Sequence, residues 1–196
     1  MRWTIHEKLE VSVTGLAAHA GVCPEKGINA LKAAAQAVAA IPCGRVDEIT
    51  MANIAEFHSP GSLNQVPDRV QFKMEVRSHR EQNLQSWIDR AHRELEQACA
   101  QVGARFTMER ARCTGAVSVP EDSPLIRMLV EIYRELDFEA GPAAGFGGSD
   151  TAWLFANGIE AVNLGTGMGN LHSVDEFIRM EDLERVTRVL EKLAAR

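Results

Sequence analysis

The chain has 196 residues, of which 45% are apolar, and a formal net charge of −6 at pH 7. The length allows one large domain or two small ones, and the absence of clustered Lys and Arg argues against nucleic acid as a partner. The sequence contains no apolar run long enough to span a bilayer and no apolar core of a signal peptide at its N-terminus. We therefore expect no membrane partner and a cytoplasmic location.

The four cysteines lie far apart and form no Cys-x-x-Cys pair. This spacing is typical of neither a disulfide framework nor a thiolate zinc site. Free thiols in a reducing compartment are the simpler interpretation of Cys23, Cys43, Cys99 and Cys113.

The first half of the chain is predicted to alternate strands and helices in the order β-α-β-β-α-β. Apolar and polar residues alternate most clearly over residues 70–77, which indicates a strand with one buried face. This order over residues 7–113 predicts a ferredoxin-like sandwich within a mixed α/β (α+β) fold. The expected strands cover residues 9–13, 48–56, 70–77 and 105–109, and the expected helices cover residues 28–41 and 84–102.

The apolar spacing also predicts which face of each helix is buried. The second helix shows a regular apolar stripe closed by Gly103, the residue type favoured just after a helix. The first helix combines an apolar stripe with many alanines, which allow close packing on a neighbour. The predicted stripes are Ile28, Leu31, Ala35, Val38 and Ile41 in the first helix, and Leu84, Trp87, Ile88, Ala91, Leu95, Ala98 and Val102 in the second.

Residues 114–196 follow a different pattern and are predicted to form a second domain. Ser123 and Pro124 are typical of the beginning of a helix, and a second helix is expected over residues 151–158. Residues 159–164 are predicted to be a buried strand. A last helix is expected to bury Leu183, Val186, Val189, Leu190 and Leu193.

Two glycine-rich loops flank that predicted strand. Gly145 to Asp150 ends in a carboxylate, and Gly169 to Glu176 carries His172 with two acidic residues close behind it. Loops at the carboxyl ends of strands commonly bind ligands, and a loop histidine can bind a metal. The sequence therefore predicts one wall of an active site here.

Pattern alone leaves the other candidates open. His19 lies among small apolar residues, where a packing or capping role is more common than ligand contact. Arg77 ends a strand whose charged face is normally solvated, although that position allows it to reach a site. The histidines at positions 6, 58, 79 and 92 are interpreted as surface or packing residues.

Four ordered motifs give a more specific indication. They are Val13-Thr14-Gly15-Leu16-Ala17-Ala18-His19-Ala20-Gly21, Asn64-Gln65-Val66-Pro67-Asp68, Glu75-Val76-Arg77-Ser78, and Gly147-Gly148-Ser149-Asp150 followed by His172-Ser173-Val174-Asp175-Glu176. In this order the chain resembles the peptidase T-like branch of the aminoacylase and carboxypeptidase superfamily of metallopeptidases.

The resemblance implies an architecture and a chemistry. Residues 7–113 correspond to a lid domain that also forms a homodimer, and residues 114–196 to the C-terminal part of a catalytic α/β domain. The family hydrolyses small peptides or amides with two divalent metals, usually zinc, which activate water.

Individual residues take roles by the same resemblance. His172 matches a metal ligand, and His19 matches a lid histidine that reaches across the dimer to the substrate and the developing oxyanion. Asn64 and Arg77 match lid positions that bind polar ends of the substrate. The substrate-side loop of the catalytic domain corresponds to Gly148, Ser149 and Asp150.

The remaining metal ligands and the general base of the family lie in an N-terminal catalytic half that this sequence does not contain. A catalytic zinc takes about three protein ligands, so we expect this chain alone to bind metal poorly and to be inactive. One interpretation is therefore a fragment of a peptidase T-like aminopeptidase. The alternatives are a stand-alone dimerisation and interaction module, or a ferredoxin-like regulatory domain that binds a small ligand.

Overall fold

The computed structural model describes residues 2–139 and 141–196, which divide into two compact units. The sandwich unit comprises residues 4–116, and the C-terminal unit comprises residues 2–3 together with 117–196. Both units combine strands with helices, which confirms the predicted mixed α/β class. Within the described ranges, no helix has both the length and the apolar character needed to cross a membrane.

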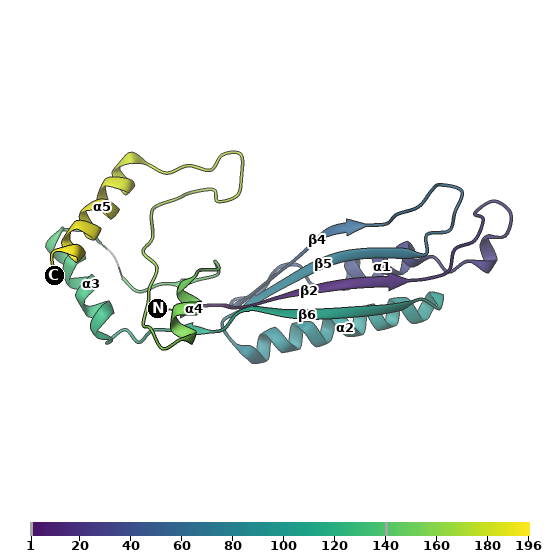
Figure 1. The fold of residues 1–196 in the computed structure, drawn as a ribbon, viewed down its shortest axis with the longest axis horizontal. Coiled ribbons are helices and arrows are strands. Elements are labelled where there is room, and N and C mark those ends of the chain that lie inside the picture. Colours follow the sequence, from purple (N-terminus) through teal and green to yellow (C-terminus); the bar gives the residue numbers. More distant parts are fainter. Residues whose placement is uncertain (1, 140) are drawn as a thin grey trace. The chain divides into compact units, whose positions relative to one another are not determined.

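The sandwich unit is built on a five-stranded antiparallel sheet with the order β3-β4-β5-β2-β6 (Figure 1). The central strands β2 and β5 pair along their whole length, so that Leu9 lies opposite Met74 and Val11 opposite Phe72. Because side chains alternate across a strand, these residues form one continuous apolar face. The strands are β2 (Ile5–Thr14), β3 (Gly44–Asp47), β4 (Thr50–His58), β5 (Arg69–Ser78) and β6 (Arg105–Thr114).

Two helices, α1 (Ala30–Ala40) and α2 (Glu81–Val102), pack on the apolar face of this sheet. Apart from the short strand β3, which the sequence pattern did not indicate, the order is the predicted βαββαβ. The ferredoxin-like sandwich is therefore confirmed. Helix α2 buries its predicted stripe except for the half-buried Val102, and Gly103 ends it in the left-handed conformation with φ 78°.

The predicted buried stripe of the first helix is wrong at two of its five positions, since Ile41 is buried and Ile28 and Val38 are half-buried. Leu31 and Ala35 are exposed, and the helix instead buries four alanines on a neighbouring face. Small side chains let a helix approach the sheet and α2 closely, so close packing outweighs side-chain bulk in choosing the face. The buried residues of α1 are Ala30, Ala33, Ala34 and Ala37.

A buried carboxylate joins β2 to β6. Glu7 is only 3% exposed, and its two oxygens accept hydrogen bonds from Arg110 Nε at 3.0 Å and Arg112 Nε at 2.8 Å. Arg112 also donates to both oxygens of Glu81 at the start of α2. This network ties the edge strand β6 to the centre of the sheet and to a helix.

The described residues of the C-terminal unit form a smaller sheet and three helices. Strand β1 (Arg2–Trp3) pairs antiparallel with β7 (Val117–Ser118) and parallel with β8 (Ala144–Gly145). The helices are α3 (Pro124–Glu135), α4 (Thr151–Ala156) and α5 (Met180–Ala194). As predicted, Ser123 caps α3 by accepting a hydrogen bond from the Ile126 backbone N–H.

Two predictions for this unit are wrong. Residues 159–164 form no strand, because among the described residues no strand lies alongside to supply hydrogen-bond partners. Of the predicted stripe of α5, Val189 is buried, Val186 and Leu193 are half-buried, and Leu183 and Leu190 are exposed. Both differences have the same physical cause, which is a shortage of neighbouring structure to pack against.

Candidate functional site

Two loops meet at one end of the sandwich unit and bring His19 and Asn64 together. His19 forms an antiparallel bridge with Gln65, and the Ala20 backbone N–H donates to the Asn64 carbonyl at 2.8 Å. At the base of the loop that carries His19, Gly15 lets the backbone pass close to Ile28, since a Cβ there would lie 2.0 Å from the Ile28 carbonyl oxygen. Both side chains of the pair are exposed. The structure thus presents a histidine and an amide on one tip.

The ring of His19 is oriented by its own loop. The Gly21 backbone N–H donates to His19 Nδ1 at 3.1 Å. A neutral imidazole that accepts at Nδ1 carries its proton on Nε2. His19 therefore presents an N–H donor to solvent, which is the form that an oxyanion contact needs.

Arg77 lies at the opposite end of the sheet from this tip. The tip loops leave β2 at Thr14, which pairs with Arg69 at the start of β5, whereas Arg77 is near the end of β5 and pairs with His6. Eight residues of strand span about 26 Å at the usual rise per residue. The structure does not bring Arg77 together with His19 and Asn64 within one chain.

Pattern reasoning missed two residues that surround Arg77. Glu75 Oε2 contacts Arg77 Nη2 at 3.1 Å and His6 Nε2 at 3.0 Å. Burial, followed by the charge of Arg77, lowers the pKa of His6. Burial alone would raise the pKa of Glu75, but Arg77 and then His6 lower it overall. The signal for this cluster was the register of β2 against β5, which sequence alone does not reveal.

In the C-terminal unit, the loop before α4 is held by Ser149. Its hydroxyl donates to Asn163 Oδ1 at 2.7 Å and accepts from the Thr151 backbone N–H at 3.2 Å. Asp150, immediately before α4, is exposed, and so is Gly148 on the other side of Ser149. Ser149 is therefore engaged within its own unit, whereas the other two predicted residues face solvent.

His172 occupies a tight loop closed by Gly169 and Phe177, whose backbones exchange two hydrogen bonds. Its φ of 63° is left-handed, and its backbone N–H donates to Glu176 Oε2 at 2.6 Å. A left-handed non-glycine residue costs of order 1 kcal/mol or more, and such strain persists mainly where surrounding contacts hold it. The exposed imidazole of His172 is presented by this loop.

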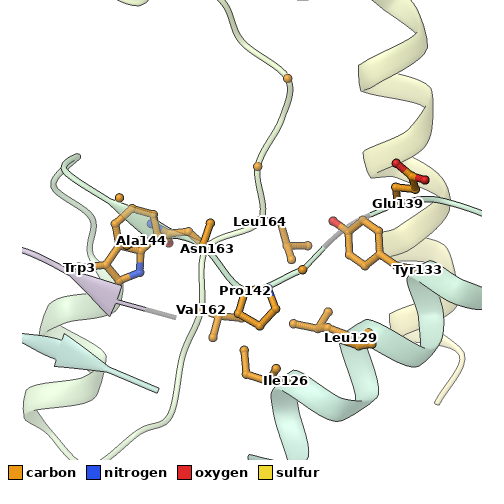
Figure 2. Close-up of a pocket in the computed structure, with 16 residues that line it drawn as sticks. Trp3, Ile126, Leu129, Tyr133, Glu139, Pro142, Ala144, Val162, Asn163 and Leu164 are labelled. Atoms are coloured by element: carbon orange, nitrogen blue, oxygen red, sulfur yellow. The ribbon is translucent and has the colours of Figure 1, made fainter. Parts of the chain in front are cut away.

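No metal site is assembled within the described ranges, which contain no group of three or more His, Cys, Asp or Glu residues placed to hold an ion. The C-terminal unit has instead an apolar cavity of 460 Å³ (Figure 2). Ile126, Leu129 and Tyr133 of α3 face Pro142 and Val162 across it. Asn163, which accepts the hydrogen bond from Ser149, lines this cavity, and Gly148 lies with Val162 and Asn163 in a neighbouring hollow.

Comparison with known proteins identifies the class. Residues 6–103 match the peptidase dimerisation domain of the M20 peptidases. The chain belongs to this family, and the peptidase T-like resemblance is confirmed.

Two relatives match nearly the whole chain in sequence. The chain is 29% identical over 191 residues to the uncharacterised protein YqjE of Bacillus subtilis, covering 95% of this chain and 52% of that protein. It is 24% identical to peptidase T of Macrococcus caseolyticus, covering 90% of this chain and 44% of that protein.

Two solved structures are also similar. The aminopeptidase PepT of Bacillus cereus superposes with a TM-score of 0.79 at 27% identity, covering 96% of this chain and 51% of that one. A tripeptidase of Staphylococcus aureus superposes with a TM-score of 0.86 at 25% identity, covering 100% of this chain and 53% of that one. The chain thus spans about half the length of the curated relatives it matches.

Proposed function

We propose that this chain is the dimerisation and substrate-capping half of a metal-dependent aminopeptidase that hydrolyses small peptides. Residues 7–113 would be the lid and dimerisation domain, and residues 114–196 part of the catalytic domain. The observation that carries the proposal is the exposed His19–Asn64 tip, in which His19 offers an Nε2–H donor. A donor fixed in this way suits a developing oxyanion better than a base would.

The separation of the two ends of β5 supports a homodimer. About 26 Å of strand separates the His19–Asn64 tip from Arg77. The tip and Arg77 can therefore reach one substrate only if they come from different chains. In a two-fold dimer, the tip of one protomer would cap the site to which its partner contributes Arg77. Arg77 would bind the substrate carboxylate, for which the planar guanidinium is suited.

The metals of the proposed enzyme are zinc ions, and this chain's contribution to them is His172. The described residues by themselves do not fit a two-metal site, so the remaining ligands would come from a catalytic half. Gly148 and Asp150 would line the substrate side of the same site. A reducing, cytoplasmic compartment is part of the proposal, because all four cysteines are free.

The test joins the chain to the complementary half of the Staphylococcus aureus tripeptidase. We expect zinc-dependent hydrolysis of a tripeptide by the fused enzyme and none by the chain alone. His19→Ala should lower kcat about a hundredfold, as expected for the loss of one oxyanion donor. His58→Ala, at an exposed histidine elsewhere in the sandwich unit, is the matched control and should have no effect.

A folded, zinc-loaded fusion without activity would contradict the proposal. That result would favour the second candidate, a dimerisation module without peptidase chemistry. The observation that favours this candidate is that the described residues assemble no metal site. Sedimentation measures the oligomeric state. The aminopeptidase half and the dimerisation module both predict a dimer, whereas a ligand-binding regulatory domain could be a monomer.

A further inference from the structure

We infer that Glu75, anchored by His6, is a positioning residue that holds the guanidinium of Arg77 in the orientation needed to bind a substrate carboxylate. This inference rests on the proposed function of Arg77. It adds a role for two residues whose importance sequence reasoning did not indicate.

The geometry places Glu75 between two donors. Glu75 and Arg77 are two residues apart on β5, so their side chains leave the same face of the sheet. His6 lies on the adjacent strand β2, directly opposite Arg77. One oxygen, Glu75 Oε2, receives Arg77 Nη2 at 3.1 Å and His6 Nε2 at 3.0 Å. The carboxylate is thus fixed from the neighbouring strand while it holds the arginine.

The anchor is more buried than the group it positions. The His6 side chain is 9% exposed, against 25% for Arg77 and 32% for Glu75. Burial lowers the pKa of His6, so at neutral pH its ring is neutral and donates to Glu75 without adding charge. A buried neutral anchor fixes the position of the carboxylate, and the carboxylate then restricts a guanidinium that still reaches solvent.

The functional consequence concerns preorganisation. A long arginine side chain loses rotamer freedom when it binds a ligand, and a side chain that is already held loses less. Bidentate recognition of a carboxylate also requires a defined guanidinium plane. Glu75 would therefore act on substrate affinity through Arg77, without touching the substrate.

The first test is NMR of the full chain with isotope-labelled arginine. The Arg77 Nε–Hε signal is assigned by its loss in Arg77→Lys. We expect this group to be ordered in the wild-type chain and to become mobile in Glu75→Gln. Glu56→Gln is the matched control, because Glu56 forms a 2.6 Å ion pair with Lys73 on the same sheet. An Arg77 group that stays equally ordered in Glu75→Gln overturns the inference.

The second test uses the fused enzyme and a tripeptide substrate. Glu75→Gln should raise KM about tenfold, the loss of one charge-assisted contact, with kcat within about twofold of wild type. Glu75→Asp, which keeps the charge, should recover part of this loss. If Arg77→Lys raises KM but Glu75→Gln leaves it unchanged, the positioning role is overturned. If Arg77→Lys also leaves KM unchanged, the proposed function of Arg77 itself is contradicted.

Discussion

The two units differ in how well they bury their own apolar side chains. In the sandwich unit the inner faces of β2 and β5 and the stripe of α2 form one continuous core. The C-terminal unit has a much smaller core around Val117 and Ile126. Among the described residues, ten large apolar side chains are exposed in the C-terminal unit and five in the sandwich unit. Exposed apolar surface marks interaction sites, so this difference supports the proposal that residues 114–196 are part of a larger catalytic domain.

The largest expected effect comes from separating the units. A fragment of residues 4–116 should unfold cooperatively, because its sheet pairing and core lie within that range. A fragment of residues 117–196 should lack a cooperative transition and bind a hydrophobic dye. Circular dichroism during thermal unfolding measures both. Cooperative unfolding of the second fragment would contradict the comparison.

A matched pair of aromatic substitutions compares the cores of the two units more sharply. Phe72 is 2% exposed, so Phe72→Ala should lower the free energy of unfolding by about 3–5 kcal/mol. Trp153 is 60% exposed, so Trp153→Ala should change it by less than about 0.5 kcal/mol. Urea unfolding gives both values, and similar costs at the two positions would be inconsistent with the account.

Much of the sandwich unit was predictable because its signals are local. The alternation over residues 70–77, the stripe of α2 and the Gly103 end of that helix are all confirmed. The buried alanine face of α1 could not be predicted, because the choice between two apolar faces depends on what the helix packs against. Residues 159–164 have the composition of a strand, but a strand also needs a neighbour.

The candidate site was predictable only where motifs carry it. His19 and Asn64 were named from their motifs, but their adjacency and their separation from Arg77 depend on loop contacts, strand direction and register. His6 was interpreted as a surface or packing residue, and its 7% exposure agrees with packing, but its hydrogen bond to Glu75 was not predicted. Long-range pairing of two strands determines that contact.

The buried carboxylate of the sandwich unit gives an intermediate effect. Glu7→Gln should lower the free energy of unfolding by about 2 kcal/mol, since two arginines lose a buried charged partner but remain partly solvated. Glu81 pairs with Arg112 at a more exposed position. Glu81→Gln should therefore lower the free energy of unfolding by less than about 1 kcal/mol. Equal costs would show that the burial of Glu7 is unimportant.

The smallest effect is a pH dependence from His6. Its pKa in the folded chain is lowered from 6.5 by burial and by Arg77, with Lys8 in the same direction and Glu75 opposing. The unfolded state then binds more protons, so stability should fall as the pH drops below about 6.5, by at most about 1.4 kcal/mol per unit. His6→Gln keeps a donor but cannot titrate, and should flatten the profile between about pH 5 and 7. An unchanged profile would assign this dependence to other groups.

The most direct test of the central claim mixes two impaired variants of the fused enzyme, His19→Ala and Arg77→Ala, at a substrate concentration where each alone has little activity. If the two ends of each sandwich unit serve different sites of a dimer, a mixed dimer contains one intact site and one that lacks both groups. Random mixing should then restore about a quarter of the wild-type activity, because half of the dimers are mixed. Activity that stays at the level of the separate variants, in a sample shown by mass spectrometry to contain mixed dimers, would contradict the account.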